Sequence, residues 1–114
     1  MAANSQDMIV YRILSYLRRC LDEGRRANMD HLQCRSETFP VEPARWSEIF
    51  YFLMKRGYVD GVRHTPVLGN KHAVQVTSDV TITAEGEDYL RNDPGMERAA
   101  EVAKTVETHI QYLE

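Results

Sequence analysis

The side chains best suited to contact another molecule lie in one stretch of the middle of the chain. Arg45, Ser47, Glu48, Tyr51 and Lys55 fall on the polar side of a helical repeat. A guanidinium can make a bidentate contact to guanine in the major groove, and hydroxyl groups can reach phosphates or bases. A carboxylate there is repelled by phosphates unless it accepts from cytosine. The stretch therefore predicts DNA contacts, and the alternative is an ordinary solvated surface.

A second group of polar side chains follows in a stretch rich in turn residues. Arg63, His64, Asn70, Lys71 and His72 flank or occupy a segment that also contains proline and glycine. Cations in such a loop can neutralise phosphates, which adds salt-dependent affinity without sequence choice. We predict a phosphate-contacting loop here, with a plain polar loop as the alternative.

Residue patterns for catalysis or metal binding are missing from the sequence. There is no phosphate-binding loop, nucleophile elbow or paired-carboxylate motif. His31 and Cys34 have a helix-compatible spacing, but no second pair completes a tetrahedral metal site. We therefore expect no enzyme activity, no metal and no cofactor, and we expect Cys20 and Cys34 to be reduced thiols.

Length and charge favour one domain with two differently charged ends. The 114 residues, of which 43% are hydrophobic, suit a single domain over residues 1–114. The longest apolar run, 49–54, is far shorter than the roughly 20 residues of a membrane span, so a cytoplasmic protein is expected. Residues 1–57 contain nine Lys/Arg against seven Asp/Glu, whereas residues 84–114 contain three against eight. A DNA face separated from an acidic face is one interpretation, and ordinary solvated surface is the other.

The elements that would position these residues begin with helices. A helix capped by Asn4 or Ser5 should end at Gly24, and Asn28 or Asp30 could cap a short second helix. The apolar positions of the first helix recur at helical spacing. They are Val10, Ile13, Leu14, Leu17 and Leu21.

A third helix should run from Pro43 to Arg56 and turn its apolar side to the core. The apolar positions of this helix are Trp46, Ile49, Phe50, Leu53 and Met54. Gly57 is expected to end it in a left-handed conformation. This arrangement would leave Arg45, Ser47 and Tyr51 facing a partner.

Two strands and two more helices should follow. Strands near Tyr58–Val62 and Val74–Ile82 predict an antiparallel hairpin with a long loop, which is typical of a wing. Thr83 should cap the next helix. The helix over 95–114 carries an apolar seam that would pack on the first helix or pair with a second copy in a dimer. The seam consists of Met96, Ala99, Ala103, Val106, Ile110 and Leu113.

Two sequence blocks carry a family resemblance. The helix end and strand over 53–62 and the Thr-x-x-Gly-x-x-Tyr-Leu run over 83–90 are followed by an amphipathic helix. From about Met8 to Leu113 the chain resembles the YjcQ family of small winged-helix proteins of Gram-positive bacteria and their phages. The segment 25–39 and Trp46 depart from the family pattern. The resemblance implies the fold and provides no catalytic residue.

The sequence thus predicts an α+β winged helix-turn-helix with three N-terminal helices, a hairpin wing and two C-terminal helices. The function expected of it is DNA binding by a transcriptional regulator, with double-stranded DNA and a second copy of the chain as partners. The alternative is a winged-helix module for protein–protein interaction, which the overall acidity and Glu48 favour.

Overall fold

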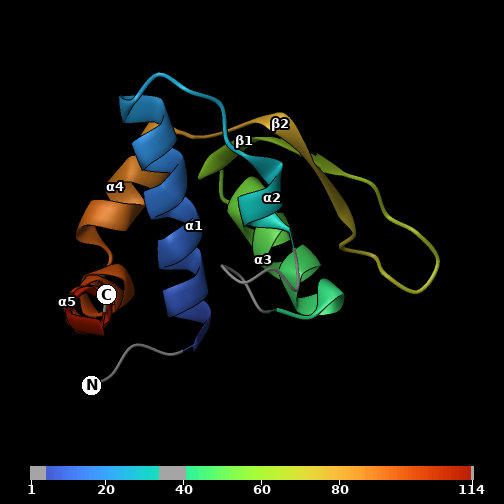
Figure 1. Cartoon of the computed structure of the whole chain (residues 1–114). Helices are drawn as coiled ribbons and strands as arrows, with labels where there is room; N and C mark the ends of the chain where they lie inside the picture. Colours follow the sequence, from blue (N-terminus) through green and yellow to red (C-terminus); the bar gives the residue numbers. More distant parts are fainter. Residues whose placement is uncertain (1–4, 34–40, 114) are drawn as a thin grey trace.

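The computed structural model describes residues 5–33 and 41–113 and has the predicted order of elements (Figure 1). The order is α1 (Ser5–Asp22), α2 (Met29–Leu32), α3 (Pro43–Lys55), β1 (Val59–His64), β2 (Val74–Ile82), α4 (Ala84–Asn92) and α5 (Pro94–Leu113). Strands β1 and β2 form a two-stranded antiparallel sheet. The predicted α+β class is confirmed, and a hairpin flanked by helices in this order is compatible with a winged helix.

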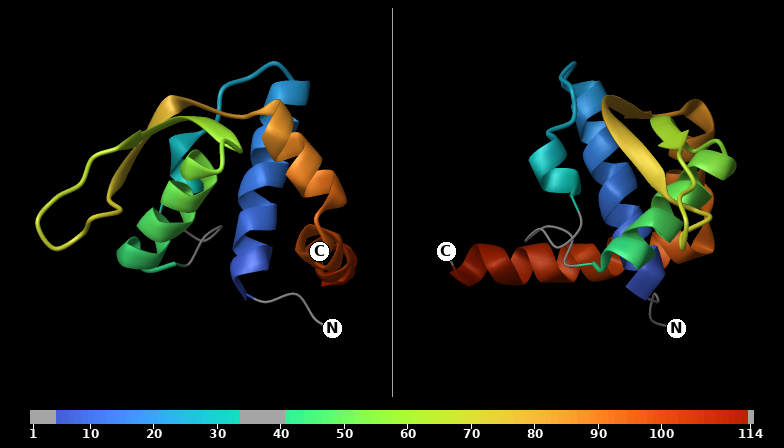
Figure 2. Two further views of the ribbon diagram at one scale, coloured as in Figure 1. Left: turned by 180° about the vertical axis from the view of Figure 1, so that it is seen from behind. Right: turned by 90° about the vertical axis from the view of Figure 1, so that its right-hand side faces the viewer.

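Helix α1 stands in the middle of the molecule. Helices α4 and α5 lie on one side of it, and α2, α3 and the hairpin lie on the other (Figures 1 and 2). Its apolar side is buried as predicted, with Leu14 fully inaccessible. The prediction for Leu21 was wrong, because this side chain is 50% exposed. After α1 the chain turns back, with the amide of Arg25 donating to the carbonyl oxygen of Cys20 (3.0 Å), and Cys20 is buried where Leu21 is not.

Helix α3 turns its apolar side inward as predicted. Phe50 and Leu53 are fully buried, and Trp46 packs against Phe50 with ring centroids 4.9 Å apart. The indole N–H of Trp46 donates to the carbonyl oxygen of Leu32 (2.7 Å), which ties α2 to α3. Asn28 caps α2 by accepting from the amide of Asp30 (2.9 Å). A large aromatic side chain therefore holds the short second helix in place.

The hairpin has one irregularity near its base. The register pairs Val59 with Ile82 and His64 with Val74, and it shifts between Asp60 and Val62. Gly61, which lies between those two residues, has a φ of 86°. A Cβ at this position would lie 2.5 Å from the Cα of Val80. Only glycine fits a bulge of this kind, and a bulge bends the strand that carries it.

Helix α5 begins at Pro94 and is longer than the helices around it. Met96 and Ala99 are fully buried, and the C-terminal part of the helix runs away from the other elements (Figure 2). Beyond residue 104 only its backbone is described, so the predicted seam residues Val106, Ile110 and Leu113 lie outside the described side chains. Among the described residues, no helix has the length and apolar character needed to cross a membrane.

The first turn of α4 lies against the strand start at Tyr58. Thr83 caps α4 as predicted, accepting from the amide of Gly86 (3.0 Å). The amide of Thr83 donates to the carbonyl oxygen of Tyr58 (3.0 Å). Gly86 is buried, and a Cβ there would overlap that same carbonyl oxygen. The glycine is therefore required by the close approach of two backbone segments.

This contact predicts the effect of Gly86→Ala. Helix propensity alone would stabilise the protein by about 0.5–1 kcal/mol. Because the methyl group would overlap backbone atoms, we expect the free energy of unfolding to fall by about 3 kcal/mol instead. Urea unfolding followed by circular dichroism measures this free energy. The exposed neighbour change Glu85→Ala should stay within about 0.5 kcal/mol, and a stabilised Gly86→Ala protein would contradict the packing described here.

Candidate functional site

The outer side of α3 exposes charged residues along most of its length. Arg45 and Glu48 are exposed in its first half, and Lys55 is exposed at its end. The cation of Lys55 lies 5.8 Å from the centre of the Tyr51 ring. These residues are on the side opposite to the buried Phe50, as the helical repeat predicts.

Ser47 departs from the prediction. We expected its hydroxyl on the exposed face, but the residue is buried, with 8% of its surface accessible. Ser47 lies one turn before Tyr51, and residues four apart share one side of a helix. Tyr51 is itself half-buried because the hairpin crosses α3 on that side. The hydroxyl of Ser47 is therefore not available to a partner in this conformation.

The hairpin loop, residues 65–73, is held on α3 by a cluster of aromatic and charged side chains. The rings of Tyr51 and His72 are stacked with centroids 4.0 Å apart and planes 9° apart. Nδ1 of His72 lies 2.8 Å from both carboxylate oxygens of Glu48. His64 meets the Tyr51 ring edge-on at 5.0 Å. Two predicted contact residues of α3 and one of the loop are therefore bound to each other.

The loop has internal contacts that keep its shape. Nε2 of His64 donates to the carbonyl oxygen of Lys71 (2.7 Å), which closes the base of the loop. The side-chain oxygen of Asn70 accepts from the amide of His72 (3.1 Å), and Asn70 also pairs with Val67. We predicted Asn70 as a contact residue, but its side chain is half-buried and holds the shape of the loop. Lys71 and Arg63 are exposed, as expected.

Sequence reasoning placed α3 and the loop in the same surface but did not find the cluster that joins them. Tyr51 and His72 are 21 positions apart, and no periodic pattern links a helix position to a loop position. The only signal was chemical, since two histidines next to a turn-rich segment and an aromatic residue on a polar helix side are suited to stacking.

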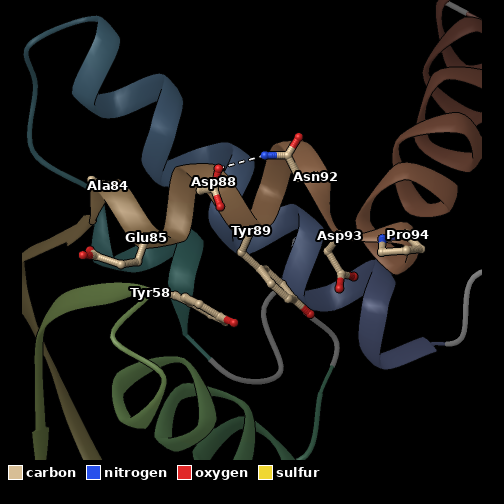
Figure 3. A pocket seen from close by; sticks show the side chains of 8 residues that line it. All are labelled: Tyr58, Ala84, Glu85, Asp88, Tyr89, Asn92, Asp93 and Pro94. Atoms are coloured by element: carbon tan, nitrogen blue, oxygen red, sulfur yellow. Dashed lines mark hydrogen bonds between the residues drawn. The ribbon is translucent and has the colours of Figure 1, made fainter.

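An open groove of about 640 Å³ lies at the other end of the molecule, along α4 (Figure 3). Sequence reasoning did not identify it. Tyr58 and Tyr89 line it with stacked rings whose centroids are 4.4 Å apart. Burial, together with the negative charges of Asp93 and Asp7, raises the pKa of Tyr89 to about 12. Tyr89 is therefore a neutral phenol at physiological pH.

Comparison with known proteins identifies the family. The model of the YjcQ protein family matches residues 11–108. The chain belongs to the YjcQ family. No curated protein and no solved structure gives a significant match to it.

This YjcQ family member has two surfaces of interest, the α3–loop surface formed by residues 43–55 and 65–73 and the groove along α4, and the family match covers both. It includes all of α3, the hairpin and α4, and it ends within α5. The family therefore shares the segments that build the α3–loop surface and the α4 groove, and its description names no ligand for either.

The predicted cysteine and histidine features are only partly described. Cys20 is a buried free thiol, whereas Cys34 lies outside the described residues. Within residues 5–33 and 41–113 there is no group of three or more His, Cys, Asp or Glu side chains that could hold a metal. His31 lies at a tilt to the Tyr16 ring, with centroids 5.8 Å apart.

The stacked pair predicts that His72→Ala releases the hairpin loop from α3. Loss of an aromatic contact should lower the free energy of unfolding by about 1 kcal/mol. The larger effect should be local, because the loop loses its bonds to α3 while the core is unchanged. We expect faster hydrogen exchange at the amides of 65–73 and unchanged exchange in α1.

The neighbouring change Lys71→Ala is the matched control, because its side chain is exposed and only its carbonyl oxygen closes the loop. Equal loop exchange in the His72→Ala and Lys71→Ala proteins would show that the ring stack does not hold the loop.

Proposed function

We propose that this protein is a DNA-binding regulator of the cytoplasm and not an enzyme. In this proposal the fold is a winged helix, α3 enters the major groove, and the hairpin loop is the wing that contacts the neighbouring phosphate backbone. Arg45 and Lys55 would contact DNA from α3, and Arg63 and Lys71 would contact it from the hairpin.

The observation that carries the proposal is the stack of Tyr51 on His72. It fixes the loop beside α3, so that Lys55, whose cation lies 5.8 Å from the centre of the Tyr51 ring, and Lys71, the exposed neighbour of His72, lie next to the same stack. A helix next to a projecting hairpin suits a duplex, because the helix fits the major groove while the hairpin reaches an adjacent groove or strand. The cluster keeps these two elements in a fixed relation before any DNA is bound.

Glu48 is the residue that argues most against DNA, and its position lessens the objection. A free carboxylate on the outer side of α3 would repel phosphates. In the structure its two oxygens face Nδ1 of His72. The Nδ1–H group of His72 donates to this carboxylate, so Glu48 acts in this proposal as an anchor for the loop and not as a base-reading group.

DNA titrations at several salt concentrations test the proposal. We expect binding to random duplex DNA that weakens steeply with salt, because each neutralised phosphate releases counterions. Replacing Arg45 and Lys71 together by alanine should weaken binding about tenfold or more and lower the salt slope by about two. Fluorescence anisotropy of a labelled duplex gives both quantities.

The matched control removes the same charge from the other side of the molecule. Arg91→Ala with Lys104→Ala changes exposed residues of α4 and α5, and it should leave the salt slope unchanged. A failure to bind DNA even at low salt, or an equal loss in both double variants, would exclude the proposed surface.

The second candidate function is a protein-interaction module that binds no DNA, and the tip of the hairpin loop favours it. Leu68 is fully exposed and Val67 is 59% exposed. An apolar loop tip surrounded by solvent is typical of a contact with another protein. A protein-interaction module should show no affinity for duplex DNA at low salt, which is the result that excludes DNA binding.

We further propose that two copies pair through α5. The seam of the sequence continues to Leu113, past the part of the helix that is buried against the body, where Met96 and Ala99 lie. Two copies would place their α3 helices to read half-sites about 34–36 Å apart.

Analytical ultracentrifugation measures directly how many chains associate. We expect a mass of two chains that falls to one chain in Ile110→Glu, because a charge would interrupt the seam. Thr108→Glu is the control, since it adds the same charge off the seam. A single-chain mass for the unaltered protein at high concentration would exclude the dimer.

A further inference from the structure

The groove along α4 has the properties of a binding surface that the proposed DNA contacts do not use. Its volume is about 640 Å³. The lining residues come from the position just before β1, from the whole length of α4 and from the junction of α4 with α5 (Figure 3). They are Tyr58, Ala84, Glu85, Asp88, Tyr89, Asn92, Asp93 and Pro94. We propose that this groove binds an arginine side chain in an extended segment of a partner protein.

The aromatic floor of the groove is held rigidly. The amide of Tyr58 donates to the carbonyl oxygen of Leu53 (2.9 Å), and its own carbonyl oxygen accepts from Thr83 (3.0 Å). Its ring meets Phe52 edge-on at 6.1 Å and stacks on Tyr89 with planes 20° apart. Figure 3 shows both phenol groups pointing the same way along the groove. A ligand that stacks here does not first have to order the two rings.

The charge of the groove selects the ligand. Glu85 and Asp88 are exposed on α4, and Asp93 is half-buried at its end. None of the eight described lining residues carries a positive charge. Burial is the main cause of the raised pKa of Tyr89, the charges of Asp93 and Asp7 add to it, and the nearby cation of Arg56 acts in the opposite direction. The lining of the groove is therefore complementary to a cation and favours a cationic ligand over a phosphate.

Stacked rings next to carboxylates suit arginine better than other cations. A guanidinium is planar, stacks on aromatic faces and donates to a carboxylate through two parallel N–H groups. An ammonium group is a strongly hydrated point charge that gains less from a ring face. Because the groove is open along its length, it can also accept the backbone on either side of the arginine, so a segment of a partner protein fits better than a small free cation.

The groove and the hairpin loop lie at opposite ends of the molecule (Figure 1). Helix α4 starts beside the end of α3, where Thr83 bonds to Gly57 and Tyr58, and then packs against α1 on the side away from the loop. Bound DNA on the α3 side would leave the groove open, so one chain can hold both partners. The groove would then connect the regulator to another protein, and the inference stands whether or not DNA binds.

Titration with synthetic peptides tests the inference on the full chain without any DNA. The probe is a short serine–glycine peptide with a pair of arginines, blocked at both ends. Nuclear magnetic resonance should show the signals of Tyr58, Tyr89 and α4 shifting with the peptide, while the loop signals stay unchanged. Replacing Glu85 by Gln and Asp88 by Asn together should weaken binding about threefold to tenfold, as expected for exposed charge pairs.

The control pair Asp60→Asn and Asp79→Asn removes the same charge from exposed positions of the hairpin and should bind as the unaltered chain does. Three results would overturn the inference: equal binding of a lysine or glutamate peptide, equal binding of arginine amide alone, or shifts confined to α3 and the loop. An unchanged urea midpoint of the Glu85 and Asp88 variant shows that its weaker binding does not come from unfolding.

Discussion

The contact between the Tyr58 backbone and the first turn of α4 is the constraint on which both surfaces depend. Thr83 donates from its amide to the carbonyl oxygen of Tyr58 and from its hydroxyl to that of Gly57 (2.5 Å). Gly86 allows the helix to approach because it has no side chain to place there. This junction joins the end of α3, both strands at their base and the start of α4. Its hydrogen bonds give partners to the backbone carbonyl groups at the end of α3, which the helix itself leaves unpaired.

The junction determines where the hairpin leaves the body of the protein. From the pair Val59–Ile82 the strands run outward, and the irregularity at Gly61 bends them next to Val80. Because a bulge increases the local twist of a hairpin, its position decides which side of α3 the loop crosses. The loop meets α3 at Tyr51, and the contacts of His72 hold it there. The same junction presents the Tyr58 ring to Tyr89, so the groove and the α3–loop surface share one support.

The elements could largely be predicted from the sequence because their signals are local. The apolar repeat through Phe50 and Leu53, the glycine at 57 and the Thr83 cap each act within a few residues. Ser47 was misjudged because a polar residue at the edge of an apolar stripe is exposed only if no other element covers it. The stack of Tyr51 on His72 and the pairing of Tyr58 with Tyr89 join distant positions, and neither leaves a periodic trace. The sequence therefore predicted the two segments of the site but not the contacts that join them.

The path of the chain also explains why the two ends differ in charge. Helix α4 starts at the base of the hairpin and lies at the other end of the molecule from the loop, so most of the acidic residues in 84–101 are carried away from Lys71. At physiological ionic strength the Debye length is about 8 Å, so charges across the 28 Å width of the molecule hardly affect each other. A net charge of −3 therefore does not describe the field at either surface. An acidic protein of this shape can attract phosphates at one end and a guanidinium at the other, because each ligand responds to the charges nearest to it.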